Sequence, residues 1–238
     1  MARVRIVLVE PREAGNVGAV ARAMKNFGFA ELVIAGQHPQ LFPVSGWWAS
    51  GADDVLAEAR FVATLEDAIG DAHLTVATTS MRGRTNATSF NPRTLSARVA
   101  TLEDDQIVAM VFGREDKGLT REEVVLCQHT AAIPTNAAFP TMNLAQSVCV
   151  FAYELSQIEP APASRVLPTA GMLERLHQRA QALLLEVGFL HGNNPERIYD
   201  DLRNMLARTD VDEREATILL GIVRQIEWKL RQPPADPP

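Results

Sequence analysis

The sequence predicts an α/β domain built on a parallel sheet, followed by a small all-helical domain. Short uninterrupted apolar runs, which are typical of strands buried on both faces of a parallel sheet, alternate with segments of helical periodicity. After residue 158 the strand-like runs stop and only helical spacing follows. A length of 238 residues and a hydrophobic content of 47% suit one main domain with a sizeable core and a small appendage.

The amino-terminal segment predicts a strand, a helix and a second strand. Residues 5–10 form an apolar run, residues 16–27 place apolar side chains on one helical face, and residues 31–35 are again apolar. Arg22 lies away from that apolar face, so the pattern alone describes an ordinary solvated cation. The loop before the helix has no Gly-x-Gly-x-x-Gly pattern, which argues against a nicotinamide oxidoreductase.

Two features follow in residues 37–93. The pair Trp47-Trp48 either stacks on nucleic-acid bases or, more commonly for such residues, serves packing or a subunit interface. Residues 73–78 predict a buried strand that ends in small hydroxyl residues. The long loop 82–93 is rich in Thr and Asn, and we expect it to be mobile.

The central segment contains two strands and two helices. Residues 107–112 predict a strand that is buried on both faces and closed by glycine. Thr120 with Glu123 three positions later forms a capping box, which predicts the start of a short helix. Residues 131–133 predict a brief strand, and a largely apolar helix begins at Asn143.

These elements predict a ligand site at one edge of the sheet. Gly113 and Ile133 end two strands, and residues 142–144 begin a helix. Because open α/β folds bind ligands at the carboxyl edge of the sheet, we expect the exposed backbone groups of these three segments to meet there.

Three motifs in this chain resemble those of a known family. N-V-G-A-V-A-R-A-M-K-N-F-G spans residues 16–28, F-G-R-E-D-K-G-L-T spans 112–120, and I-P-T-N and M-N-L-A-Q-S-V begin at Ile133 and Met142. In this order they resemble the motifs of the SpoU branch of the SPOUT RNA methyltransferases, over about residues 4–158. The resemblance implies a parallel-sheet SPOUT fold with a C-terminal trefoil knot, a homodimer, and S-adenosyl-L-methionine as cofactor. The knot rests on the resemblance alone, because periodicity cannot reveal one.

The resemblance also implies roles for individual residues. The cofactor-binding residues implied are Thr79, Ser80, Met81, Gly113, Ile133, Thr141, Met142, Asn143 and Leu144. The catalytic residues implied are Arg22, Asn16, Asn143 and Glu115. The RNA-binding residues implied are Arg82, Arg84 and Arg93.

Methyl transfer to a ribose hydroxyl requires positioning and proton removal, and it needs no metal. A guanidinium group stays protonated in proteins, so we expect Arg22 to clamp a phosphate or ribose oxygen rather than act as a general base. Glu115 either receives a proton or orients Arg22, or it is a solvated turn carboxylate. Ile133, Met142 and Leu144 suit an apolar slot for adenine, although without the resemblance they would be ordinary core residues.

Within the branch, the chain is most similar to bacterial enzymes that methylate the 2′-hydroxyl of the pyrimidine at position 32 of the tRNA anticodon loop. Two alternatives stay open: methylation of ribosomal RNA by the same chemistry, and a non-catalytic RNA-binding module. The partners expected are therefore tRNA and a second copy of the chain, with residues of both copies in each site.

Composition bounds these expectations. A net charge of −6 argues against a generally basic nucleic-acid binder, although no acidic residue lies between Asp71 and Glu103 while four arginines do. Cys127 and Cys149 lack zinc-ligand spacing and are expected to fill the core of a protein in a reduced cytosol. No apolar run approaches membrane-spanning length, so we expect a cytoplasmic protein without a membrane partner.

The expected division of the chain is a methyltransferase domain, a linker and a helical extension. The methyltransferase domain takes residues 1–158, a proline-rich linker takes 159–170, and the extension takes 171–238. Within the extension, helical spacing predicts helices over 171–190, 196–207 and 211–230. They predict a small bundle that either contacts tRNA by shape or serves dimer packing.

Overall fold

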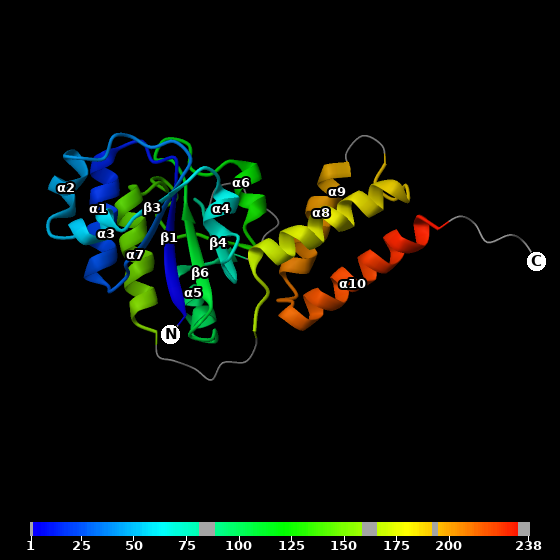
Figure 1. Ribbon diagram of the computed structural model, residues 1–238. Helices are drawn as coiled ribbons and strands as arrows, with labels where there is room; N and C mark the ends of the chain where they lie inside the picture. The colour runs from blue at the N-terminus through cyan, green and yellow to red at the C-terminus, as the bar shows by residue number, and fades with distance from the viewer. Residues whose placement is uncertain (1, 81–88, 159–165, 192–194, 233–238) are drawn as a thin grey trace, which may run out of the picture.

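The computed structural model describes residues 2–80, 89–158, 166–191 and 195–232 (Figure 1). Within these residues, seven strands form a sheet in the order β3-β2-β1-β6-β4-β7-β5, and every neighbouring pair is parallel. The strands are β1 (Arg3–Val9), β2 (Glu31–Ala35), β3 (Arg60–Val62), β4 (Leu74–Thr78), β5 (Ser89–Phe90), β6 (Ile107–Phe112) and β7 (His129–Ala131). The predicted α/β class with a parallel sheet is confirmed.

Helices cover both faces of this sheet. The helices in the described part of the chain are α1 (Ala14–Asn26), α2 (Val44–Ala49), α3 (Asp53–Ala57), α4 (Leu65–Ile69), α5 (Pro92–Val99), α6 (Arg121–Leu126), α7 (Leu144–Ser156), α8 (Ala170–Glu186), α9 (Pro195–Ala207) and α10 (Glu213–Leu230). One core cluster joins the sheet to α1, α5 and α7, and a second joins it to α4 and α6. Because the central strand β6 lies between two apolar layers, all six of its residues are buried.

A glycine on α1 brings α2 close to it. A Cβ atom at Gly18 would lie 2.0 Å from the carbonyl oxygen of Ser45, so any side chain at this position would collide with the backbone of α2. Gly18 therefore determines how closely α2 packs against the helix that carries the first motif.

The three C-terminal helices lie to one side of the α/β domain (Figure 1). The backbone N–H of Ala170 donates to the carbonyl of Ala72 at 2.7 Å, which fixes the start of α8 against the sheet domain. On α9, Arg203 Nη2 donates to the carbonyl of Val125 at the end of α6, at 3.2 Å. The guanidinium of Arg121, on α6, pairs with Asp200 of α9.

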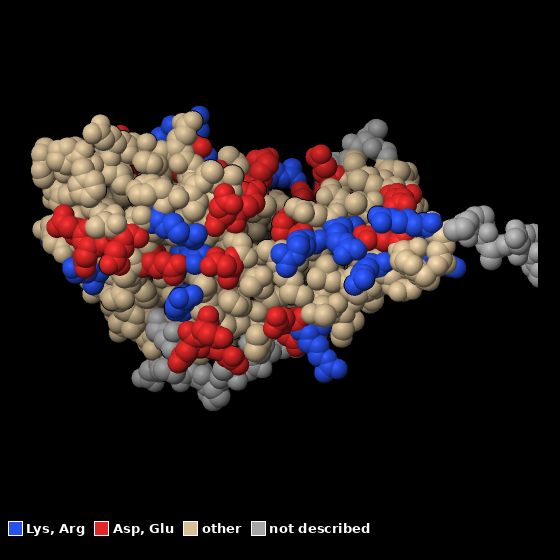
Figure 2. Space-filling model, in the orientation of Figure 1, with Lys and Arg blue, Asp and Glu red and all other residues tan. Residues whose placement is uncertain are grey.

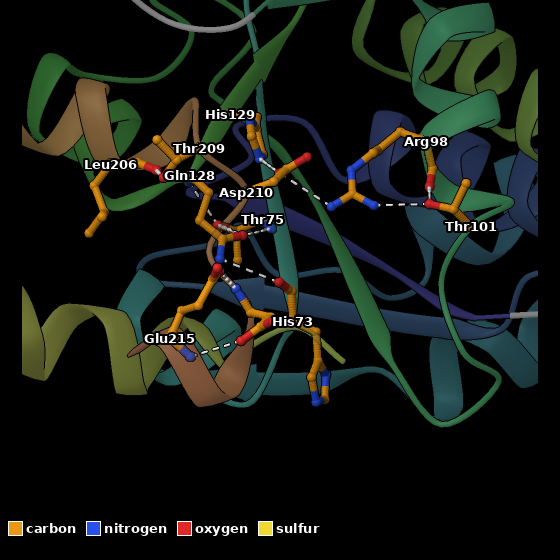
Figure 3. A network of polar contacts seen from close by, with 11 residues as sticks. His73, Thr75, Arg98, Thr101, Gln128, His129, Leu206, Thr209, Asp210 and Glu215 are labelled. Atoms are coloured by element: carbon orange, nitrogen blue, oxygen red, sulfur yellow. Dashed lines mark hydrogen bonds and ion pairs between the residues drawn. The ribbon is translucent and has the colours of Figure 1, made fainter. Parts of the chain in front are cut away.

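A polar network also joins β7 to the loop before α10 (Figure 3). Asp210 Oδ1 lies 3.2 Å from Arg98 Nη2 and 3.7 Å from His129 Nε2. His129 is only 5% exposed, and its ring packs edge-on against Phe90 with centroids 5.3 Å apart. Burial lowers the pKa of His129 to about 4, although the carboxylate of Asp210 acts in the opposite direction. The imidazole is therefore neutral near pH 7.

Some predicted boundaries are wrong. The strand expected over 131–133 lies over 129–131, because polar His129 and Thr130 are buried and pair with β4. In the loop expected over 82–93, residues 89–90 form β5 and residues 92–93 begin α5, where Asn91 and Thr94 make a capping box. Residues 82–88 lie outside the described part of the chain.

Candidate functional site

A cleft of about 310 Å³ opens at the carboxyl edge of the sheet, where β4 and β6 end. It is lined by Thr78, Thr79, Ser80, Gly113, Arg114, Glu115, Asp116, Lys117, Gly118, Leu119, Ile133, Thr135, Pro140, Thr141, Met142, Leu144, Ser147 and Phe151. The three segments that the sequence predicted to converge thus lie in one cleft. Of the expected cofactor residues, Asn143 caps the adjacent helix instead of lining the cleft, and Met81 lies outside the described residues.

The turn after β6 is tight enough to require glycine at its first position. A Cβ atom at Gly113 would lie 2.2 Å from the carbonyl carbon of Gly118. Gly118 has a φ of +67°, and its N–H donates to the carbonyl of Arg114 at 2.8 Å. The absence of side chains at both ends leaves backbone groups at the floor of the cleft accessible to a ligand.

Arg114 fixes this turn from within, a role that the sequence did not indicate. Its Nη atoms donate to both carboxylate oxygens of Glu123 at 2.9 and 3.0 Å, and its Nε donates to Glu10 at 2.8 Å. The Arg114 side chain is 11% exposed, and the Glu123 carboxylate raises its pKa further above the usual value. Glu123 is also the predicted partner of Thr120 in the capping box, which is confirmed. Arg114 therefore links the turn to α6 and to the end of β1.

A chain of hydrogen bonds connects the motifs at the mouth of the cleft. Glu115 Oε1 accepts from Asn16 Nδ2 at 2.9 Å, and Glu115 Oε2 accepts from the backbone N–H of Arg12 at 2.8 Å. Asn16 Oδ1 accepts in turn from Asn143 Nδ2 at 3.0 Å. Asn143 Oδ1 accepts from the N–H of Ala145 at 2.9 Å and so caps α7. Because Glu115 is bonded to the start of α1, the alternative of a free, solvated turn carboxylate is not supported.

The expected cationic residues lie outside this cleft. Arg22 is exposed on α1, two turns beyond Asn16, and makes no hydrogen bond or ion pair with any residue that the structure describes. Arg93 is exposed in the first turn of α5. Arg82 and Arg84 lie outside the described residues. Arg22 is thus free to contact a ligand or a second copy of the chain.

A second, larger cavity lies elsewhere. A cavity of about 710 Å³ lies between α6, β7 and the C-terminal helices α8 and α9, and none of the expected site residues lines it. It contains both acidic and basic side chains, several of which pair with each other, such as Arg203 with Glu174 at 2.7 Å. The smaller cleft is the candidate site because the sequence motifs meet there.

Surface charge is uneven. Figure 2 shows Lys and Arg side chains gathering over the three C-terminal helices, while the α/β domain on the same face carries more Asp and Glu. Among the described residues, no group of three His, Cys, Asp or Glu side chains could hold a metal ion. Cys127 is buried, Cys149 is half-buried, and neither forms a disulfide. No helix in the described ranges is long and apolar enough to span a membrane.

The fold and the cleft define an α/β protein that binds a small, partly apolar ligand at the carboxyl edge of a parallel sheet. Residues 3–153 match the model of the SpoU rRNA methylase family, and residues 160–235 match that of the tRNA methyltransferase TrmJ C-terminal domain. The chain therefore belongs to the SpoU rRNA methylase family. The resemblance inferred from the three motifs is confirmed.

Individual relatives cover nearly the whole chain. The tRNA (cytidine/uridine-2′-O-)-methyltransferase TrmJ of Pectobacterium atrosepticum is 35% identical over 235 residues, which are 94% of this chain and 96% of that protein. The tRNA (cytidine/uridine/adenosine-2′-O-)-methyltransferase TrmJ of Pseudomonas aeruginosa is 34% identical, with 94% of each chain covered. The crystal structure of TrmJ from Z. mobilis superposes with a TM-score of 0.84 at 29% identity, covering 95% of this chain and 100% of that one. The SPOUT-type fold with C-terminal helices is confirmed, and the knot stays a prediction.

Proposed function

We propose that this chain transfers a methyl group from S-adenosyl-L-methionine to the 2′-hydroxyl of a ribose in tRNA. The observation that carries the proposal is the hydrogen-bond chain from Glu115 through Asn16 to Asn143, which joins the family's motifs beside the cleft. Family membership and the relatives that bear tRNA 2′-O-methyltransferase names support the same reaction. The nucleotide proposed is the pyrimidine at position 32 of the anticodon loop.

The cleft fits the expected cofactor. Its volume of about 310 Å³ is at the lower end of the range for small-molecule sites. Ile133, Met142 and Leu144 provide an apolar slot for adenine, and Gly113 allows the tight turn that lines the cleft, because a Cβ atom there would collide with the backbone of Gly118. Thr79 and Ser80 add hydroxyl groups at the end of β4. When bound, S-adenosyl-L-methionine supplies an activated methyl group on a good leaving group.

The chain's own residues position the acceptor. Arg22 carries a permanent charge, so its proposed role is to hold a phosphate or ribose oxygen and to stabilise the charge that develops on the attacking oxygen. Asn16 and Asn143 orient the hydroxyl, and Glu115 keeps Asn16 in place through the 2.9 Å hydrogen bond. Because Arg22 does not line the cleft of its own chain, it acts on a ribose held at the cleft of a second copy.

A homodimer is therefore part of the proposal. The outer side of the packed pair α1 and α7 is apolar: Phe27 meets Tyr153 edge-on with centroids 5.9 Å apart, and Tyr153 is 51% exposed. Cys149 and Val150 on α7 are only half-buried beside it. A second copy covering this face would bury these side chains and bring two Arg22 residues to the shared boundary. Sedimentation equilibrium measures this directly, and a strictly monomeric active enzyme would contradict it.

Several further assignments belong to the same proposal. Arg82, Arg84 and Arg93 contact the RNA through its phosphates. The chain acts in the cytoplasm. Its functional division is a methyltransferase domain over 1–158, a linker over 159–170 and a helical extension over 171–238.

The test is the transfer of labelled methyl groups from S-adenosyl-L-methionine to purified tRNA and, separately, to ribosomal RNA. Incorporation into tRNA is expected, and mass spectrometry of tRNA from a strain lacking the gene should show loss of one ribose methylation at position 32. Incorporation into ribosomal RNA alone would favour the second substrate class. Calorimetry without any cofactor binding would instead favour a non-catalytic RNA-binding module.

A further inference from the structure

We propose that the indole of Trp48 is a stacking platform for a base of the tRNA substrate, beside the nucleotide that is methylated. The proposal rests on the proposed function and adds a substrate-positioning residue outside the family's three motifs. It selects base stacking from the two uses that the sequence left open for the tryptophan pair.

Trp48 packs against the start of α1. A Cβ atom at Gly15 would lie 3.1 Å from Cδ1 and 3.1 Å from Nε1 of Trp48, so the indole rests directly on the backbone of α1 at Gly15. The next residue, Asn16, is the middle member of the hydrogen-bond chain between Glu115 and Asn143. The indole therefore lies one residue from the centre of the candidate site.

Two glycines on α1 create this arrangement. Gly18 admits the backbone of α2, with Ser45 as its contact, and Gly15, almost one turn earlier, admits the indole at the end of α2. Any larger residue at Gly15 would push the ring outward. The sequence thus holds Trp48 against the start of α1 instead of leaving it to solvent.

Despite this support, most of the ring stays uncovered. Trp48 is 60% exposed and its neighbour Trp47 is 73% exposed, although a large aromatic side chain gains most by being buried. A ring that is fixed on one side and open on the other is the geometry that proteins use to stack nucleic-acid bases.

The charges nearby favour RNA as the occupant. Arg22 is seven residues after Gly15 and so lies on the same side of α1. Arg12 is exposed just before the start of α1, and Lys117 is exposed in the turn at the cleft. None of these three side chains has an ion-pair partner among the described residues, whereas Lys25, also on α1, pairs with Asp54 at 2.8 Å.

Two carboxylates, those of Glu13 and Asp116, are exposed in the same segments, so the region is not uniformly basic. Cations without an ion-pair partner and an open aromatic ring together suit a nucleotide, because the cations can bind its phosphate and the ring can stack on its base. A second copy of a chain with net charge −6 is the competing occupant, and the experiment separates the two.

The experiment compares three substitutions at one position with a remote control. Trp48→Phe keeps an aromatic ring, Trp48→Leu keeps apolar bulk without stacking, and Trp48→Ala removes both. Phe61→Leu changes another exposed aromatic side chain, 48% exposed on the edge strand β3. Methylation kinetics are measured with an unmodified tRNA transcript, cofactor affinity by calorimetry, and association state by sedimentation.

Stacking on an aromatic residue contributes about 5-fold to about 150-fold in affinity per base. We expect Trp48→Leu and Trp48→Ala to raise the KM for tRNA at least about 5-fold, with unchanged cofactor affinity and unchanged association state. Trp48→Phe should recover most of the loss, and Phe61→Leu should behave as wild type.

Fluorescence gives a second readout. The chain contains three tryptophans, so a Trp47→Phe, Trp228→Phe variant reports on Trp48 alone. Adding the transcript should quench this emission at the concentration that half-saturates methylation, and adding cofactor alone should not.

Each outcome either supports or refutes base stacking on Trp48. If Trp48→Leu keeps wild-type KM, or if it shifts the chain to a monomer, stacking is refuted and, in the second case, Trp48 belongs to the subunit interface. A wild-type chain that methylates tRNA while Trp48→Ala is kinetically normal overturns only this inference. A wild-type chain that neither binds nor methylates the transcript overturns the proposed function as well.

Discussion

The pH dependence of stability provides a quantitative test of how β7 is buried. Burial lowers the pKa of His129 to about 4, whereas a histidine in the unfolded chain titrates near 6.5. Between these values the unfolded chain binds a proton that the folded chain does not, so the free energy of unfolding falls as the pH falls below about 6.5. The contribution of neutral His129 to the free energy of unfolding is therefore present at neutral pH and lost in acid.

The magnitude follows from the two pKa values. Their separation corresponds to about 3 kcal/mol once the pH falls below the folded pKa, and about 2 kcal/mol of this is lost by pH 5. His177 on α8 is half-buried, and its pKa is also lowered to about 4, chiefly by desolvation, so it contributes a similar amount. Wild-type protein should thus lose about 4 kcal/mol between pH 7.5 and pH 5 from these two residues.

The variant His129→Phe isolates one contribution. Phenylalanine keeps the edge-on ring contact with Phe90 but cannot be protonated. Urea unfolding at pH 7.5 and pH 5.0 should show a loss of stability about 2 kcal/mol smaller in the variant than in the wild type. His38→Phe, at an exposed position, is the matched control. Equal losses in His129→Phe and wild type would show that His129 is not held neutral by burial, and the reasoning would fail.

Three further predictions concern the candidate site. Arg22→Ala should abolish methylation of tRNA while calorimetry shows nearly unchanged cofactor affinity; retained activity would exclude Arg22 from the mechanism. Gly113→Ala should abolish cofactor binding, because its Cβ atom would lie 2.2 Å from the carbonyl carbon of Gly118, and normal calorimetry would contradict the tight-turn model. Arg114→Met leaves the carboxylates of Glu123 and Glu10 without their ion-pair partner, so urea unfolding should show a loss of about 3–5 kcal/mol in the free energy of unfolding. Arg114→Lys should lose less stability. A change below about 1 kcal/mol in Arg114→Met would show that the pair is fully solvent-screened.

Local patterns predicted the elements whose signals lie within a few residues. The strand 107–112 was predicted with its observed bounds, because six consecutive apolar residues are typical of a strand buried on both faces of a parallel sheet. The capping box of Thr120 and Glu123 was equally visible, since both partners lie within one helical turn. Helix starts in the C-terminal domain were predicted to within about two residues.

Contacts between distant segments could not be predicted in this way. Glu10 meets Arg114 across 104 positions, and no local pattern marks either residue. The strand over 129–131 was expected to begin two residues later, because polar His129 and Thr130 do not continue an apolar run, yet Asp210 and Phe90 enclose His129 from other elements. The resemblance named both Asn16 and Asn143 as catalytic residues, but neither it nor the periodicity predicted the hydrogen bond between them.

The hydrogen bond between Asn16 and Asn143 spans 127 positions. The candidate site is therefore completed only by α7, which is nearly the last part of the α/β domain to be synthesised. A nascent polypeptide that has left the ribosome only as far as β6 contains six of the seven described strands but still lacks β7, as well as the glycine turn and α7, which line the cleft. Donor capture can therefore begin only after α7 has emerged and docked beside α1.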